Sequence, residues 1–127
     1  NLLRPIVAIS TYVTFCALAL YRYPACLQRL RDDLQSGHGE YREWFVHEVR
    51  RFYPFAPFLA ARTRAPFVWE GYAFQERQLV LLDVFGTNHD PRLWADPMRF
   101  LPERFAQWGN GKFDFIPQGG GDYLSGH

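Results

Sequence analysis

A carboxylate in the middle of an apolar helical stripe is the feature that most constrains the fold of this chain. With a period of 3.6 residues, Glu48 lies about 20° from the edge of an arc of about 80° that holds four large side chains, and so on the same face of the helix. These are Tyr41, Phe45, Val49 and Phe52. A carboxylate on a buried face is costly unless a cation meets it, and Arg51 lies three residues on. The stripe predicts a helix with a buried ion pair, although this spacing also occurs in exposed helix pairs.

The composition is that of a chain with a substantial core and no attraction for polyanions. Of the 127 residues, 48% are hydrophobic and 18% aromatic, which suffices for a buried core or an aromatic-lined pocket. The formal net charge of +1 provides no basic field, so nucleic acid is not expected as a partner. Cys16 and Cys26 fit a reducing compartment better than a disulfide framework, and we expect a cytoplasmic protein.

Both ends of the chain look cut. The sequence begins at Asn1 within a predicted helix and ends at His127, just after a glycine-rich stretch. We therefore expect residues 1–127 to form a single incomplete domain, a piece of a larger one. The isolated piece is not expected to fold stably, because too much of its apolar surface has no partner.

Three helices are predicted in the first half of the chain. Residues 5–21 are nearly free of charge but short for a membrane span of about 20 residues, so a buried helix is favoured over a transmembrane one. The Tyr23-Pro24 step ends this helix, and Pro24 begins a second one that ends near Gly37. The third helix runs from about Glu40 to Phe52.

The second half changes to a period of two and then becomes irregular. Residues 67–69 and 72–74 flank a Glu70-Gly71 turn and predict a hairpin, and residues 78–85 predict a third strand. Asp90 as a cap and Pro91 in the first turn predict a short helix through Trp94. From Asp96 on, aromatic residues argue against disorder. The fold class is mainly α with a small β-sheet (α+β).

A second cation for Glu48 is available in the irregular stretch, within Pro102-Glu103-Arg104-Phe105. A carboxylate between two guanidinium groups has both oxygens satisfied, and such a site would fix a loop that has no backbone ladder of its own. The alternative is that Arg104 is an ordinary surface charge.

Other patterns offer no competing site. His47-Glu48 begins like a zinc-protease motif, but Arg51 stands where the second histidine ligand belongs. We expect the histidines to be surface or hydrogen-bonded residues, with His47 on the solvent side of its helix beside Glu43 and Arg50. The triple glycine at 119–121 lacks the Lys-Ser/Thr of a phosphate loop, and both cysteines are interpreted as ordinary thiols.

The ordered series of motifs resembles the C-terminal half of a cytochrome P-450, from Asn1 to His127. The series comprises Glu48-x-x-Arg51, a small sheet, an Asp-Pro-x-x-Trp segment, Pro102-Glu103-Arg104-Phe105 and a Phe/Pro/Gly loop. The resemblance implies a partial fold of that family: a long helix, two further helices, a hairpin and strand region, a meander, and the start of the heme-ligand loop. It also implies that Glu48, Arg51 and Arg104 form a structural triad that holds the meander and this loop.

Two features resemble the fatty-acid peroxygenase branch, whose members use hydrogen peroxide directly. The glycine loop from Ile116 continues through a short insertion to His127, and Arg4-Pro5 replaces the acid–Thr pair of oxygen-activating members. The resemblance implies that Arg4 binds the carboxylate of a long-chain fatty acid, which then serves as the acid–base group, and that Pro5 opens space beside the iron. Otherwise, Pro5 is a first-turn proline and Arg4 a surface charge.

The resemblance also places the remaining candidate residues. Phe55 and Phe58 would line an apolar pocket for an acyl chain, unless their segment is only a rigid core turn. Gln118, Gly119 and His127 would contact the heme cofactor. The thiolate ligand is expected from a cysteine two positions beyond His127, so no metal ligand lies within this sequence.

The complete protein is therefore expected to be a heme-thiolate oxidoreductase that hydroxylates or decarboxylates fatty acids with hydrogen peroxide. No redox partner is expected to be needed, and the 127-residue piece alone is expected to be inactive. Two alternatives remain: a reductase-dependent cytochrome P-450 monooxygenase, and a non-catalytic remnant or binding module that keeps the scaffold.

Overall fold

The computed structural model describes the backbone of residues 3–109 and 113–117, and side chains from Ile6 onward. Three helices come first, α1 (Leu3–Arg22), α2 (Pro24–Ser36) and α3 (Glu40–Phe52). Four strands follow, β1 (Phe58–Arg62), β2 (Phe67–Trp69), β3 (Tyr72–Phe74) and β4 (Leu79–Asp83). Helix α4 (Val84–Asn88) and the 3₁₀ helix η1 (Pro102–Gln107) complete the elements. The predicted α+β class is confirmed.

Glycines and prolines delimit the helices as predicted. Pro24 occupies the first turn of α2, and Gly37 ends it with φ +74°, where its N–H donates to the Asp33 carbonyl at 3.1 Å. The Asp33 carboxylate then accepts from the backbone amides of Tyr41 and Arg42, at 3.2 and 3.3 Å. Helix α2 therefore caps the start of α3, which holds the helix carrying Glu48 in a fixed orientation.

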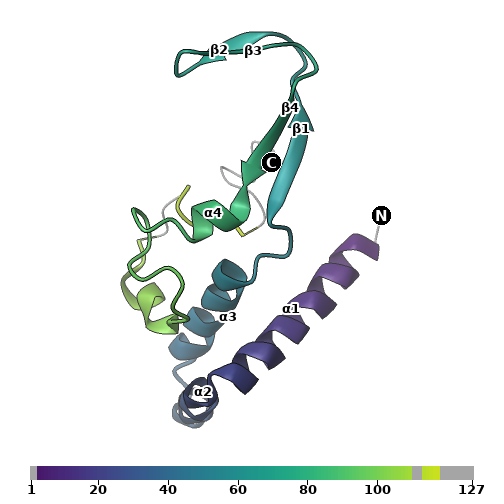
Figure 1. The fold of residues 1–127 in the computed structure, drawn as a ribbon. Coiled ribbons are helices and arrows are strands. Elements are labelled where there is room, and N and C mark those ends of the chain that lie inside the picture. The colour runs from purple at the N-terminus through teal and green to yellow at the C-terminus, as the bar shows by residue number, and fades with distance from the viewer. Residues whose placement is uncertain (1–2, 110–112, 118–127) are drawn as a thin grey trace.

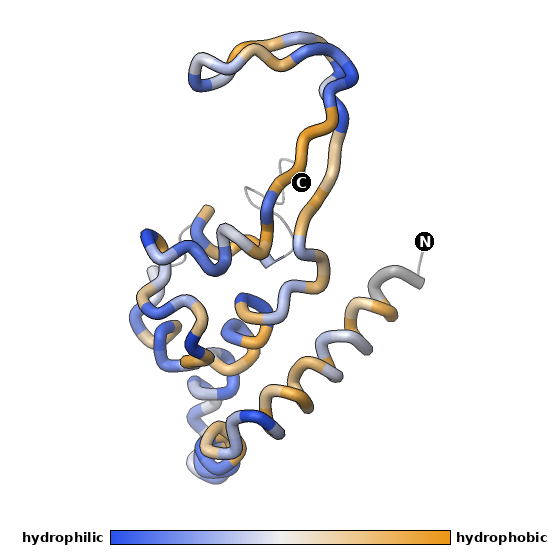
Figure 2. The backbone as a smooth tube through the Cα atoms, in the orientation of Figure 1, coloured by the Kyte–Doolittle hydropathy of each residue, from blue (hydrophilic) through white to orange (hydrophobic). Residues whose placement is uncertain are grey.

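The strands form two separate antiparallel pairs. β2 and β3 form the predicted hairpin, in which Phe67 pairs with Phe74 and the two rings stack at 4.7 Å. β4 pairs with β1, from Phe58 opposite Asp83 to Arg62 opposite Leu79. Figure 1 shows β1 and β4 as a ribbon that leads from the helices out to the hairpin. Both strands are rich in hydrophobic residues, as Figure 2 shows.

Three details of the second half differ from the predictions. Strand β1 was not predicted at all. The strand predicted over 78–85 ends at Asp83, because the Asp83 carboxylate accepts the Gly86 N–H at 2.7 Å and starts α4. The helix predicted at 91–94 is a single turn closed by Trp94 N–H on the Asp90 carbonyl at 2.9 Å. It goes no further, because Asp96 takes a positive φ of 47°.

An aromatic core fixes α1, α2 and α3 against residues 89–101, the segment between α4 and η1, here called the meander. Phe100 stacks on Tyr23 with ring centroids 4.6 Å apart and meets Phe45 and Phe52 edge-on. Ala19, Cys26 and Val49 complete the buried part of this cluster. Among the described helices, none is by itself long and apolar enough to cross a membrane; α1 from Ile6 and α2 meet that requirement only together, with a 109° bend between them.

Candidate functional site

Glu48 is fully buried and accepts four hydrogen bonds. Arg51, one turn along α3, donates from Nε to Oε2 at 2.7 Å and from Nη2 to Oε1 at 2.9 Å. The Leu101 backbone N–H donates to Oε1 at 2.7 Å, and Arg104 Nε donates to the same oxygen at 3.2 Å. The structure thus brings together the three side chains of the predicted triad, and it adds a backbone amide that no side-chain pattern could indicate.

Arg51 is also fully buried, and its remaining N–H groups are directed at backbone carbonyls of residues that follow β4 in the sequence. Nη1 donates to the Asn88 carbonyl at 2.7 Å, at the end of α4, and Nη2 lies 3.5 Å from the Arg99 carbonyl. One guanidinium group therefore joins α3 to α4 and to the meander. Such a fork of donors is specific to arginine, because the lysine ammonium group cannot present the same planar set.

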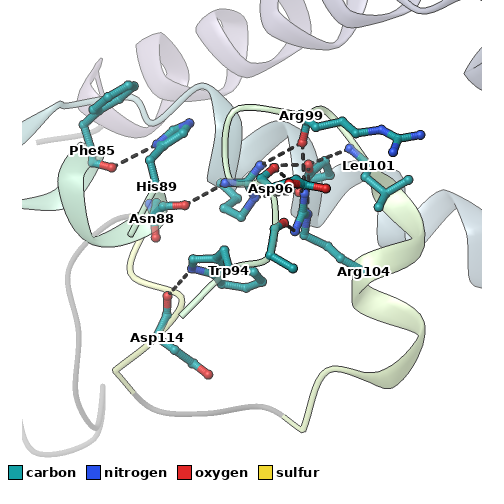
Figure 3. Close-up of polar contacts among 12 residues, drawn as sticks. Phe85, Asn88, His89, Trp94, Asp96, Arg99, Leu101, Arg104 and Asp114 are labelled. Carbon is teal, nitrogen blue, oxygen red and sulfur yellow. Dashed lines mark hydrogen bonds and ion pairs between the residues drawn. The ribbon is translucent and has the colours of Figure 1, made fainter. Parts of the chain in front are cut away.

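Arg104 extends the network from η1. Its Nη1 donates to the Ala95 carbonyl at 2.7 Å, and its Nη2 donates to the Asp96 and Arg99 carbonyls at 3.3 and 2.9 Å. The side chain is only 8% exposed, and burial lowers the pKa of Arg104, although the neighbouring Glu48 carboxylate opposes this. Figure 3 shows Arg104 directed at this turn of backbone. The alternative of a solvated surface charge is thereby excluded.

Two buried guanidinium groups share one carboxylate, and an aromatic ring lies beside both. The Cζ atoms of Arg51 and Arg104 lie 5.5 and 6.0 Å from the centroid of the Trp94 ring. At this distance, the ring quadrupole attracts a cation and offsets part of the excess positive charge. Trp94 is in turn oriented by its indole N–H, which donates to the Asp114 carbonyl at 3.0 Å.

The network continues to the segment that precedes the glycine loop. Asn88 is fully buried, and its Oδ1 accepts the Ile116 backbone N–H at 3.0 Å. Together with the Trp94–Asp114 bond, which Figure 3 shows, this contact fixes residues 113–117 next to α4. The start of the predicted cofactor loop is thus held by the same cluster that surrounds Glu48, through two bonds to its backbone.

His47 lies in an aromatic cage, and the prediction that it faces solvent is wrong. Its ring centroid is 5.3, 5.9 and 5.5 Å from those of Phe105, Trp108 and Phe115. η1 and residues 113–117 cover this side of α3, which the helical period alone could not show. Arg50 places its guanidinium group 5.5 Å from the Phe115 centroid, whereas Glu43 is exposed as predicted.

We expect this half-buried imidazole to make the complete protein less stable in mild acid. Burial, followed by the charge of Arg50, lowers the pKa of His47, and Glu43 only partly opposes this. A pKa below the ordinary value of about 6.5 means that the neutral form stabilises the fold. That contribution is complete above about pH 6.5 and is lost as the pH falls through the lowered pKa.

The test is the unfolding temperature of the complete protein between pH 7 and pH 5. His47→Phe should make the decrease shallower than in wild type, because the variant has no group to protonate in the cage. His38→Phe is the matched control, since His38 is exposed. Equal slopes for wild type and His47→Phe would contradict this account.

The remaining predicted site residues are placed only in part. Arg4 and Pro5 lie in the first turn of α1, and their side chains are outside the described part of the structure. Phe55 and Phe58 are 43% and 53% exposed, in the segment between α3 and β1 and at the start of β1. Gln118, Gly119 and His127 lie outside the described residues.

The two cysteines are ordinary free thiols, and His89 packs on an aromatic ring. Cys16 and Cys26 are free, half-buried and buried respectively, as predicted. His89 stacks on Phe85 with centroids 4.1 Å apart, and its Nδ1 lies 2.9 Å from the Phe85 carbonyl. Within residues 3–109 and 113–117, no group of three or more His, Cys, Asp or Glu side chains is arranged to hold a metal ion.

Comparison with known proteins identifies the family to which this scaffold belongs. The family model described as Cytochrome P450 matches residues 8–122 of the 127. The chain belongs to the cytochrome P450 family. The resemblance inferred from the Glu48-x-x-Arg51 series is confirmed. A curated P450, the monooxygenase ple5B of Rhodocybe pseudopiperita, is 29% identical over 115 residues. That match takes in 80% of this chain and 22% of ple5B.

Solved P450 structures match more closely. Cytochrome P450SP alpha in complex with (R)-ibuprophen is 51% identical with a TM-score of 0.84, over 100% of this chain and 30% of that one. Cytochrome P450EX alpha with myristic acid is 51% identical with a TM-score of 0.77, over 96% and 29%. A variant of cytochrome P450 OleT in complex with arachidonic acid is 39% identical with a TM-score of 0.77, over 96% and 28%. The chain therefore spans less than a third of these relatives.

Proposed function

We propose that the complete protein is a heme-thiolate peroxygenase that hydroxylates or decarboxylates long-chain fatty acids with hydrogen peroxide. The observation that carries this proposal is the 51% identity, over 96% of the chain, to P450EX alpha, a structure that contains myristic acid. P450 OleT, at 39% identity, is a second relative whose structure contains a long-chain acid. The cytoplasmic location expected from the sequence stays a prediction.

The residues present fit a flat apolar cofactor. Three large apolar side chains are between 43% and 60% exposed: Ile6 on α1, and Phe55 and Phe58 after α3. Exposed apolar groups of this size suit the face of a porphyrin or an acyl chain. Gln118, Gly119 and His127 would contact the cofactor, and a cysteine two positions beyond His127 would ligate its iron. When bound, heme supplies the iron at which peroxide is activated.

The chain's own residues bind and orient the acid. Arg4 would hold the substrate carboxylate as a bidentate pair, because a guanidinium group stays charged and matches two carboxylate oxygens. Helix α1 contains no Asp or Glu, so this helix offers no carboxylate of its own to move a proton. The substrate carboxylate held by Arg4 would take that role, and Pro5 leaves one backbone donor fewer beside it.

Turnover of the purified complete protein with myristic acid tests this proposal. Hydrogen peroxide alone, without any electron donor, is expected to give hydroxylated or decarboxylated products. A reductase with dioxygen and no peroxide is expected to give none. Turnover that requires the reductase would support the monooxygenase alternative, to which ple5B at 29% identity points, and no turnover under either condition would support a non-catalytic scaffold.

A further inference from the structure

A tyrosine on α1 fastens the segment that carries Phe55. The Phe55 backbone N–H donates to the hydroxyl oxygen of Tyr12 at 3.4 Å, across 43 residues of sequence. The two rings lie with centroids 6.4 Å apart. Tyr12 also meets Phe15 edge-on at 6.1 Å, and Phe15 stacks on Tyr53 at 5.4 Å. Aromatic rings of α1 thus hold this segment in two places.

The hydroxyl matters because residues 53–57 have few backbone bonds. Tyr53 N–H donates to the Val49 carbonyl at 2.9 Å, and the Pro57 carbonyl accepts from Phe85 N–H at 2.9 Å. Pro54 and Pro57 have no N–H to donate. Between these two ends, the described hydrogen bond that holds the middle of the segment is the one to Tyr12. Its loss frees the backbone at Phe55 while both ends stay attached.

Tyr12 and Arg4 share one rigid helix. Eight residues separate them on α1, which corresponds to about 12 Å along the axis and about 80° around it. An acid whose carboxylate is held at Arg4 has its chain bounded by Phe55, if Phe55 lines the acyl pocket. The distance between Arg4 and Phe55 is then set by the contact between Phe55 and Tyr12, because Tyr12 lies on the same helix as Arg4.

We infer that Tyr12 is a positioning residue that fixes Phe55 relative to the acid-binding end of α1 and so decides which carbon of the bound acyl chain is oxidised. This inference rests on the proposed function. Tyr12 acts through the backbone of Phe55 and not by contact with the reacting carbon or the carboxylate. Substrates of the class are long-chain fatty acids, whose carbons near the carboxylate differ only in their distance from it.

The test is Tyr12→Phe in the complete protein, with myristic acid and peroxide. This substitution keeps the packing of the ring and removes the hydroxyl oxygen that accepts the hydrogen bond from the Phe55 amide. At 3.4 Å this hydrogen bond is longer than usual, so the ratio of oxidation products should shift by about two- to threefold, the lower end of the range for one hydrogen bond. The unfolding temperature should change by only a few degrees. Tyr21→Phe is the matched control on the same helix, because Tyr21 is 86% exposed.

A calorimetric titration with myristic acid separates this inference from the proposed function. If wild type shows no peroxide-driven turnover, the proposed function fails. The dissociation constant of Tyr12→Phe should still exceed that of wild type by about two- to threefold. Product ratios and dissociation constants both equal to wild type would overturn the inference. A lower unfolding temperature with an unchanged product ratio would also overturn it, since Tyr12 would then be merely structural.

Discussion

Arg51→Ala in the complete protein is expected to give insoluble or heme-free material. The substitution removes two bonds to the buried Glu48 carboxylate and leaves the Asn88 carbonyl without its charged donor. Loss of one partner from a buried ion pair costs about 3–5 kcal/mol, against a total stability of about 5–15 kcal/mol for a typical domain. The meander and the start of the glycine loop would lose their attachment to α3 together.

The measurement is the soluble yield and the heme absorbance per mole of protein. Arg51→Lys should fail nearly as badly, because an ammonium group cannot reproduce the planar fork. Arg42→Ala is the matched control on the same helix, since Arg42 is exposed. Normal heme loading in Arg51→Ala would show that the buried pair is dispensable.

Arg4→Ala is expected to reduce peroxide-driven turnover of a long-chain acid by about 100-fold or more. If Arg4 binds the substrate as proposed, the carboxylate would no longer be held without the guanidinium group, and acid–base catalysis by a positioned group contributes about 10²–10⁴ in rate. Heme loading and the unfolding temperature should stay near wild type, because the network that stabilises the fold is centred on Glu48, Arg51 and Arg104.

Product formed from myristic acid and peroxide is the quantity to measure, with the dissociation constant of the acid beside it. Arg22→Ala removes an exposed charge at the other end of the same helix and should leave both values unchanged. Wild-type turnover in Arg4→Ala would mean that Arg4 is a flanking surface charge. In that case another group must serve as the proton carrier.

Elements with strong local signals could be predicted from the sequence almost to the residue. These signals are Pro24, the Glu40–Phe52 stripe and the Glu70-Gly71 turn, each of which acts within a few residues. The structure contains the elements that they predict. β1 escaped prediction because Ala60 and Ala61 carry little strand preference and its partner β4 lies some twenty residues away. α4 escaped because its five residues include a glycine, although Asp83 three residues before Gly86 was a cap signal.

The contacts of the candidate site also include some that could be predicted from the sequence and some that could not. The helical period predicted that Glu48 is buried, and it placed Arg51 at the edge of the buried face as a candidate partner. Arg104 was available as a second cation, with an ordinary surface charge as the alternative, and the family resemblance implied the complete triad. The contacts of Asn88 and the Leu101 amide could not be predicted, because they depend on how the meander folds back over α3. His47 was misplaced for the same reason, since its cage consists of residues nearly sixty positions or more away.

Most of the contacts that the two arginines make outside the carboxylate are to main-chain carbonyls, at Asn88, Ala95, Asp96 and Arg99. These hydrogen bonds depend on the course of the backbone and not on which side chains the bonded residues carry. Leu101 likewise contributes its amide to Glu48. The meander around Ala95 and Asp96 should therefore accept varied sequences, provided that its length and its left-handed turn are kept. For anyone redesigning this scaffold, the surface side chains of that segment can be changed with little effect on the buried charges beneath it, apart from the Asp96 carboxylate, whose charge acts on Arg104.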